Sequence, residues 1–161
     1  MAEAQFTAEE RAAFIARIAT LPQKLRALVA DLSEEQLTTH YLPHEWTVLQ
    51  NVHHLYDAHI NSYLRLKRIL TEDNPTLWSL DQDELAELAD YDMPIEDTLV
   101  LLEKLHARWV HLFNSLSDAQ WLRIGTTAKS GRTLTPEDLV RIYADHGENH
   151  LDQITRTLAA K

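Results

Sequence analysis

The sequence contains no cysteine, and only three glycines and five prolines in 161 residues. The absence of cysteine excludes disulfide bonds, a thiolate metal site and a cysteine nucleophile. So few glycines and prolines leave little material for the tight turns of a β-rich fold. The sequence also lacks an apolar run near the ~20 residues of a membrane span, and it shows no secretion signal. We therefore expect a cytoplasmic protein without a membrane partner.

Positive charge is also scarce, because 15 basic residues face 25 acidic ones and the formal net charge is -10. A surface of this sign repels phosphate backbones and anionic lipid. Among the basic residues, only Arg65, Lys67 and Arg68 form a loose cluster in the sequence. The charge balance argues against nucleic acid as a partner, and we expect a small-molecule substrate instead.

Leucine, alanine and glutamate are abundant, and all three are good helix formers. Apolar residues spaced by three and four predict four long amphipathic helices. They cover about 7–32, 47–72, a segment that opens at Pro94 and carries its apolar stripe to Leu116, and 135–159. We predict a single domain over residues 1–161, of the all-α class, forming a four-helix bundle with short extra helices in the connections.

The connections and one helix interior carry further signals. Pro22 lies inside the first predicted helix and should kink it. Segment 76–93 is predicted to be a loop with one short acidic helix around 85–88. Segment 124–134 contains glycine, serine and threonine, and we expect an exposed loop there.

Nine histidines stand out, and the spacing H-x-x-x-H occurs twice. His40 and His44 flank a proline in a connector, where helical geometry is not expected. His146 and His150 lie in a well-capped helix, and both should face inward, one turn apart. Two adjacent buried imidazoles need partners, which a shared metal ion would provide. Two hydrogen-bonded core histidines are the alternative, and the spacing leaves both interpretations open.

A zinc-protease motif is excluded, because it needs a glutamate directly after the first histidine, whereas Gly147 precedes Glu148 here. A third ligand would have to come from another helix. The second predicted helix offers His53, His54 and His59. His53 lies nearer the apolar stripe, and His54 lies on a face of short polar side chains, so periodicity does not choose among them.

The sequence resembles the DinB-like superfamily, and within it the YfiT-type metal-dependent hydrolases. The resemblance spans roughly residues 14–155. A tryptophan that opens a long helix, a histidine eight residues later and a final H-x-x-x-H are together fairly specific. The matching residues are Trp46-Thr47-Val48, His53-His54-Leu55, Asp57, His59, Asn61-Ser62-Tyr63, Arg65, Leu105-His106, Arg108-Trp109, Tyr143, His146 and His150.

This resemblance implies a four-helix bundle, often a homodimer, that holds one zinc or nickel ion per chain with three histidines. The family's ligands map onto His54, His146 and His150. Three protein ligands leave a coordination position open, which is the arrangement of catalytic sites.

The function expected from the resemblance is hydrolysis, with the metal activating water. We expect Asp57 to assist as a nearby carboxylate, and Asn61 and Arg65 to bind substrate. His106 interrupts an apolar stripe, which favours a buried structural role. Two other functions stay open: a metal-dependent transferase or isomerase that uses a low-molecular-weight thiol, and a non-catalytic metal-binding stress protein.

Overall fold

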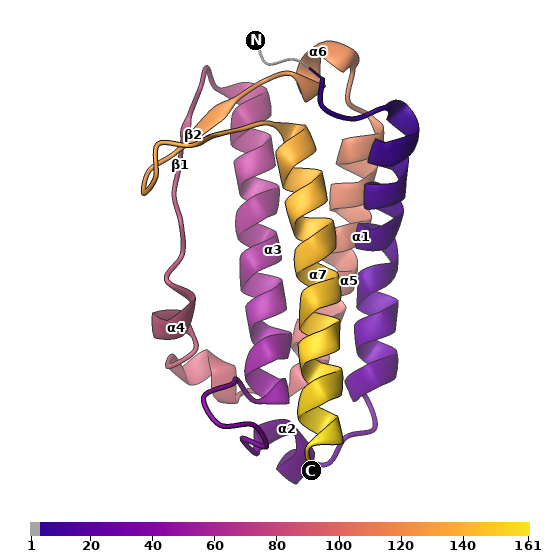
Figure 1. Ribbon diagram of the computed structural model, residues 1–161, viewed down its shortest axis with the longest axis vertical. Helices are drawn as coiled ribbons and strands as arrows, with labels where there is room; N and C mark the ends of the chain where they lie inside the picture. Colours follow the sequence, from indigo (N-terminus) through magenta and orange to yellow (C-terminus); the bar gives the residue numbers. More distant parts are fainter. Residues whose placement is uncertain (1–3) are drawn as a thin grey trace.

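The computed structural model describes residues 4–161 and forms a four-helix bundle (Figure 1). The four long helices are α1 (Ala8–Val29), α3 (Val48–Thr71), α5 (Ile95–Asn114) and α7 (Pro136–Ala159). α1 packs against α5 and α7, and α3 packs against the same two helices, so α1 and α3 are diagonal neighbours. Within the described residues, no helix combines the length and apolar character that a lipid bilayer requires.

Local sequence determines where the long helices begin. Thr7, Thr47 and Thr135 each precede a helix, and each hydroxyl accepts a hydrogen bond from the backbone N–H three residues later. The residue at that third position bonds back to the backbone of the threonine, which completes a capping box. The predicted helix boundaries are confirmed within a few residues. α1 continues through Pro22 as one helix.

The connections carry more structure than the sequence predicted. Short helices occur at α2 (Glu34–Thr38), α4 (Gln82–Leu85) and α6 (Asp118–Trp121), with a 3-10 helix, η1, at Ala89–Asp92. Three short strands, β1 (Thr76–Leu77), β2 (Gly125–Thr127) and β3 (Thr133–Leu134), form one sheet in which β1 and β2 are parallel and β2 and β3 antiparallel.

Two local predictions are therefore corrected. The short acidic helix expected around 85–88 lies earlier, at α4, and the 3-10 helix η1 follows it. Segment 124–134 is not a plain exposed loop, because Gly125 and Leu134 are buried in the sheet. These residues are buried because their strands pair with segments distant in the sequence, and local sequence does not indicate such pairing.

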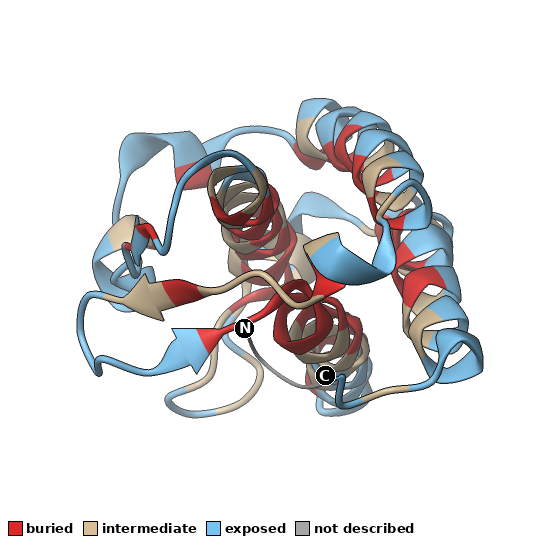
Figure 2. Ribbon diagram, turned by 90° about the horizontal axis from the view of Figure 1, so that it is seen from above, coloured by how far each residue is buried: buried red, intermediate tan, exposed pale blue. Residues whose placement is uncertain are grey.

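The buried side chains form two apolar clusters along the length of the bundle, and Figure 2 shows the buried faces of the helices turned toward one another. Residues such as Ile18, Trp109 and Leu139 belong to one cluster, and Leu25, Val52 and Ile154 belong to the other. His59 on α3 and His146 and His150 on α7 occupy helix positions between the clusters, whereas His106 on α5 lies at the edge of the first cluster, next to Leu105.

Gly147 permits the close approach of α1 and α7 beside these histidines. A Cβ atom built on Gly147 would lie 2.7 Å from Cδ2 of Leu21, a buried side chain of α1. Any side chain at position 147 would therefore push the two helices apart or displace Leu21.

We predict that Gly147→Ala lowers the free energy of unfolding by about 1–2 kcal/mol, because overpacking outweighs the gain in helix propensity. Urea unfolding measures this change. Leu21→Val, which shortens the opposing side chain, is the matched partner in a double-mutant cycle. The double variant should be more stable than the sum of the single effects, and strict additivity would contradict the close contact.

Candidate metal centre

Three histidine side chains from two helices converge at one point. His54 comes from α3, and His146 and His150 come from α7. The Nε2 atom of His146 lies 3.2 Å from Nε2 of His54 and 3.2 Å from Nε2 of His150. One ring nitrogen of each residue lies within 4.8 Å of the others, which is the spacing of a group able to hold a metal ion. The structure thus brings together the three residues singled out by the resemblance.

The distances between these nitrogens suit a tetrahedral metal. Zinc–histidine bonds of about 2.0–2.1 Å with tetrahedral angles place two ligand nitrogens about 3.3 Å apart. The two 3.2 Å separations match this value. Three imidazoles occupy three corners and leave the fourth free, so the donor set fits a zinc-type or nickel-type ion with an open position.

Asn51 determines the orientation and tautomer of His150. The Asn51 side-chain amide donates to the backbone carbonyl of Thr47 at 2.9 Å. The Asn51 oxygen therefore faces Nδ1 of His150, 2.8 Å away, and must accept a proton from it. Neutral His150 then carries its proton on Nδ1, and its Nε2 lone pair points at the centre. Asn51 was not among the residues predicted for the site, although its spacing of three before His54 places both on one helix face.

Burial keeps the three histidines in the neutral form that is able to bind metal. Removal from water lowers the pKa of His54 to about 4 and that of His150 to about 4. The pKa of His146 falls to about 3, because burial is reinforced by the neighbouring His150 and His54. Uncharged imidazole nitrogens are the form that coordinates zinc and nickel.

Trp46 closes one side of the centre. Its ring stacks on His150 at a centroid distance of 6.3 Å and an interplanar angle of 16°. The same ring lies 4.7 Å from the ring of His54. An aromatic wall against two ligands excludes water from that side and restricts their rotation.

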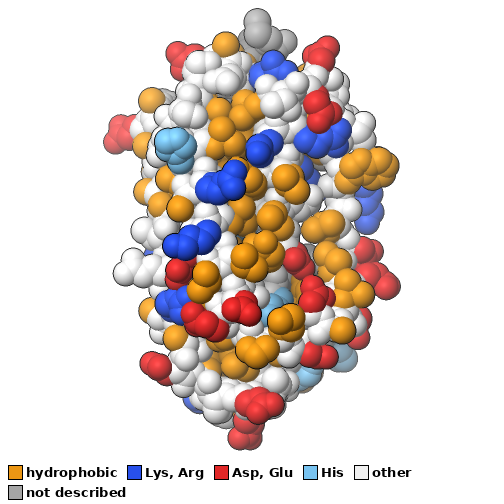
Figure 3. All heavy atoms as spheres, turned by 180° about the vertical axis from the view of Figure 1, so that it is seen from behind, with side chains coloured by type: hydrophobic (Ala, Val, Ile, Leu, Met, Phe, Trp, Pro, Cys, Tyr) orange, Lys and Arg blue, Asp and Glu red, His pale blue; other side chains and the backbone are white. Residues whose placement is uncertain are grey.

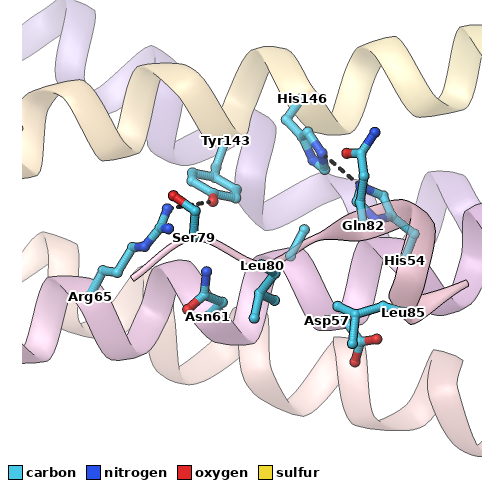
Figure 4. Close-up of a pocket in the computed structure, with 11 residues that line it drawn as sticks. His54, Asp57, Asn61, Arg65, Ser79, Leu80, Gln82, Leu85, Tyr143 and His146 are labelled. Carbon is cyan, nitrogen blue, oxygen red and sulfur yellow. Dashed lines mark hydrogen bonds between the residues drawn. The ribbon is translucent and has the colours of Figure 1, made fainter. Parts of the chain in front are cut away.

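The opposite side opens into a cleft of about 250 Å³ between α3, α7 and residues 78–88, which join β1 to η1 and are here called the crossing segment because they pass in front of α3 in Figure 4. His54 and His146 form part of its wall, so a molecule in the cleft would lie beside the centre. The other lining residues are Asp57, Ala58, Asn61, Arg65, Ser79, Leu80, Gln82, Leu85 and Tyr143.

Arg65 and Asn61 lie in this cleft, as Figure 4 shows. The Arg65 Nε donates to the Trp78 carbonyl at 2.9 Å, and a second guanidinium nitrogen bonds to the same oxygen. A third contact joins the Arg65 guanidinium to the Tyr143 hydroxyl at 3.5 Å. Arg65 therefore links the crossing segment to α3 by hydrogen bonds, and its other guanidinium N–H groups are available to the cleft.

Asp57 lies at the cleft but its carboxylate is engaged on the far side. It accepts a 2.9 Å hydrogen bond from the hydroxyl of Tyr91, which belongs to η1. Partial burial raises the pKa of Asp57, and the bond from Tyr91 acts in the opposite direction. Figure 4 shows the Asp57 side chain directed away from His146. A catalytic role for Asp57 stays a prediction.

The other candidate histidines lie outside the three-histidine cluster. His53 binds Thr98 and the Met93 carbonyl, each at 2.9 Å, and takes no part in the cluster. His40 lies in its connector with Nδ1 against the carbonyl of Glu45. His59 and His106 lie behind His146, and Nε2 of His59 is 3.1 Å from Nδ1 of His146. Sequence periodicity could not find this contact, because it joins two helices.

Comparison with known proteins gives the family. The profile of the DinB superfamily matches residues 6–154. The chain belongs to the DinB superfamily. The resemblance to this family and the four-helix bundle that it implied are therefore confirmed.

Related proteins carry a name that refers to a metal. A "Putative metal-dependent hydrolase" of Oceanobacillus iheyensis is 44% identical over 142 residues, which span 88% of this DinB-superfamily chain and 82% of that protein. A protein of the same name from Geobacillus thermodenitrificans is 44% identical over 154 residues, spanning 95% and 86%. The structure of YfiT from Bacillus subtilis, described as "a probable metal-dependent hydrolase", matches with a TM-score of 0.92 and 33% identity, over 98% of this chain and 90% of that one.

We predict that Tyr91→Phe raises the pKa of Asp57 further, because the variant loses the hydrogen bond that favours the charged carboxylate. A carbon-13 NMR titration of the aspartate carboxyls measures the pKa. Tyr56 lines a second pocket together with Asp57 and Tyr91, so Tyr56→Phe is the matched control and should leave the pKa of Asp57 unchanged. A fall in the pKa of Asp57 would contradict the role assigned to the Tyr91 hydroxyl.

Proposed function

We propose that this DinB-superfamily protein is a metal-dependent hydrolase of small molecules, with one zinc or nickel ion held by His54, His146 and His150. The convergence of three ring nitrogens within 4.8 Å of one another, with two of the separations at 3.2 Å, carries the proposal. The names of the relatives support the same activity. A bound ion of this kind supplies Lewis acidity, which activates water and polarises a carbonyl or similar bond.

The cleft beside the centre favours an enzyme over a purely structural metal site, because a substrate can reach the open side of the three histidines. In our proposal, Asn61 and the free donors of Arg65 bind polar groups of the substrate there. Asp57 is the candidate carboxylate, and it would have to leave the Tyr91 hydroxyl and turn toward the cleft to accept or orient a proton there. Leu80 and Leu85 supply apolar contacts and limit the entry of water.

The metal content of the protein tests the site. We expect about one zinc or nickel ion per chain, measured by elemental mass spectrometry on protein purified without a metal-affinity tag. His54→Ala, His146→Ala and His150→Ala should each lose the ion. His111→Ala is the matched control, since His111 lies exposed on α5, and it should keep the ion.

The reaction is tested with the metal-loaded protein. Cleavage of ester or amide substrates by wild type, with loss of activity in His146→Ala, would support hydrolysis. Consumption of a low-molecular-weight thiol in the presence of an electrophile, without hydrolysis, would contradict it in favour of the transferase. A protein that takes up neither zinc nor nickel would contradict the metal site itself.

We propose in addition that the protein is a cytoplasmic homodimer. Figure 3 shows a band of apolar side chains along the face opposite to that of Figure 1. On α5, the side chains of Val100 and Leu101 are 39% and 48% exposed. A second copy would remove such surface from water. Light scattering coupled to size-exclusion chromatography should give twice the mass of the chain, and Leu101→Glu should return it to one copy; a monomeric wild type would contradict the dimer.

A further inference from the structure

His106, His59 and His146, here called the histidine row, form an unbroken line of contacts across the bundle. Nδ1 of His106 lies 2.6 Å from the backbone oxygen of Ile18 on α1. Nε2 of His106 lies 2.9 Å from Nδ1 of His59, and Nε2 of His59 lies 3.1 Å from Nδ1 of His146. The row therefore joins the backbone of α1 to a residue of the metal centre.

The Ile18 carbonyl is available because of a proline one turn later. In an α-helix the carbonyl of residue 18 accepts from the N–H of residue 22. Residue 22 is Pro22, which has no N–H, and the helix continues through it. A buried carbonyl without a donor is costly, and the ring N–H of His106 fills that place. Pro22 thus has a role at the centre although it lies on another helix.

The Ile18 carbonyl determines which ring nitrogen carries the proton in every histidine of the row. A carbonyl can only accept, so the proton of His106 must lie on Nδ1. A neutral imidazole has one ring proton, hence Nε2 of His106 accepts and Nδ1 of His59 must donate. The same step leaves Nε2 of His59 as an acceptor for Nδ1 of His146. The proton of His146 is thereby held on Nδ1, and its Nε2 lone pair faces His54 and His150.

Burial keeps the imidazoles of the histidine row neutral. His59 is fully buried and the side chain of His106 is 1% exposed. An imidazolium in this place would face other imidazoles with no carboxylate among its hydrogen-bond partners, which is costly. Without the carbonyl at its end, the row could satisfy its contacts equally well in the reverse direction. The reverse direction would put a proton on Nε2 of His146 and block that nitrogen as a ligand.

We propose that His59 and His106 are positioning residues that hold His146 in the metal-binding tautomer, with the Ile18 carbonyl as the fixed end of the row. The inference rests on the proposed function, since it assigns a use to the Nε2 lone pair of His146. His150 is set in the same way by Asn51 and the Thr47 carbonyl. Two of the three ligands are therefore oriented by hydrogen bonds that end on helix backbone.

Proton conduction through the row is a weaker interpretation. A backbone carbonyl carries no proton and is too weak a base to be protonated, so the row ends at a group that cannot exchange protons. His106 itself is only 1% exposed at that end. A fixed direction of hydrogen bonding suits an orienting role rather than transport.

The first experiment measures zinc affinity by competition with a chromophoric chelator. His59→Leu keeps a side chain of similar volume but removes the nitrogen that accepts from His146. We expect the zinc affinity of this variant to fall about 10–100-fold. His59→Gln retains an acceptor and should recover most of the loss. His53→Leu is the matched control, because His53 is also buried on α3 and also loses two hydrogen bonds. Its zinc affinity should stay at the wild-type value.

Equal losses in His53→Leu and His59→Leu would overturn the proposal, because they would reflect general damage to α3. No loss in His59→Leu would overturn it as well. Circular dichroism of each variant establishes that the bundle is folded.

The second experiment reads the tautomer directly, in metal-free wild type, from nitrogen-15 NMR of the imidazoles. We expect the proton of His146 on Nδ1, and a proton on Nε2 would overturn the proposal even if zinc binds. This result decides the matter should His59→Leu not fold. It also separates this proposal from the proposed function. A protein that shows this tautomer yet takes up neither zinc nor nickel would refute the proposed function and leave the orienting role of the row intact.

Discussion

The constraint on which this structure depends is the enclosure of five imidazole rings within or beside the core of a helical bundle. His54, His59 and His106 are buried, and His146 and His150 are half-buried. Each buried nitrogen needs a donor, an acceptor or a metal. Backbone carbonyls of α1 and α3 serve two of these needs, one directly and one through Asn51. The Nε2 atoms of His54, His146 and His150 meet at a single point, and a cation is the partner that suits them all.

The apolar packing places this polar layer and keeps it narrow. One hydrophobic cluster lies on each side of the histidines, so both halves of the bundle hold the helices in register. Gly147 lets α7 approach Leu21 of α1 between two metal-ligand candidates. Pro22 lies one position further along α1, where it releases the carbonyl that His106 uses. The contact between α1 and α7 therefore contributes to the geometry of the centre although α1 supplies no ligand.

Access to the centre depends on the segment that crosses in front of α3. The sheet pairing of β1 with β2 holds one end of this segment, and the Tyr91–Asp57 hydrogen bond holds the other. Between them, Arg65 binds the carbonyl of Trp78. These three attachments form the outer wall of the cleft and set its width. A substrate would thus be selected by a connection between helices, while the chemistry stays on the rigid helices themselves.

The sequence by itself determined the helices, because capping residues such as Thr47 and Thr135 and the spacing of apolar residues act locally. It also indicated His146 and His150 as a pair one turn apart on an inward face. Periodicity could not choose among His53, His54 and His59, and only the resemblance selected His54. The tertiary structure decided what depends on distant segments meeting: the strands around Gly125, the engagement of Asp57 by Tyr91, and the row from Ile18 to His146. A hydrogen bond between helices leaves no periodic trace in either helix, which is why local sequence did not reveal it.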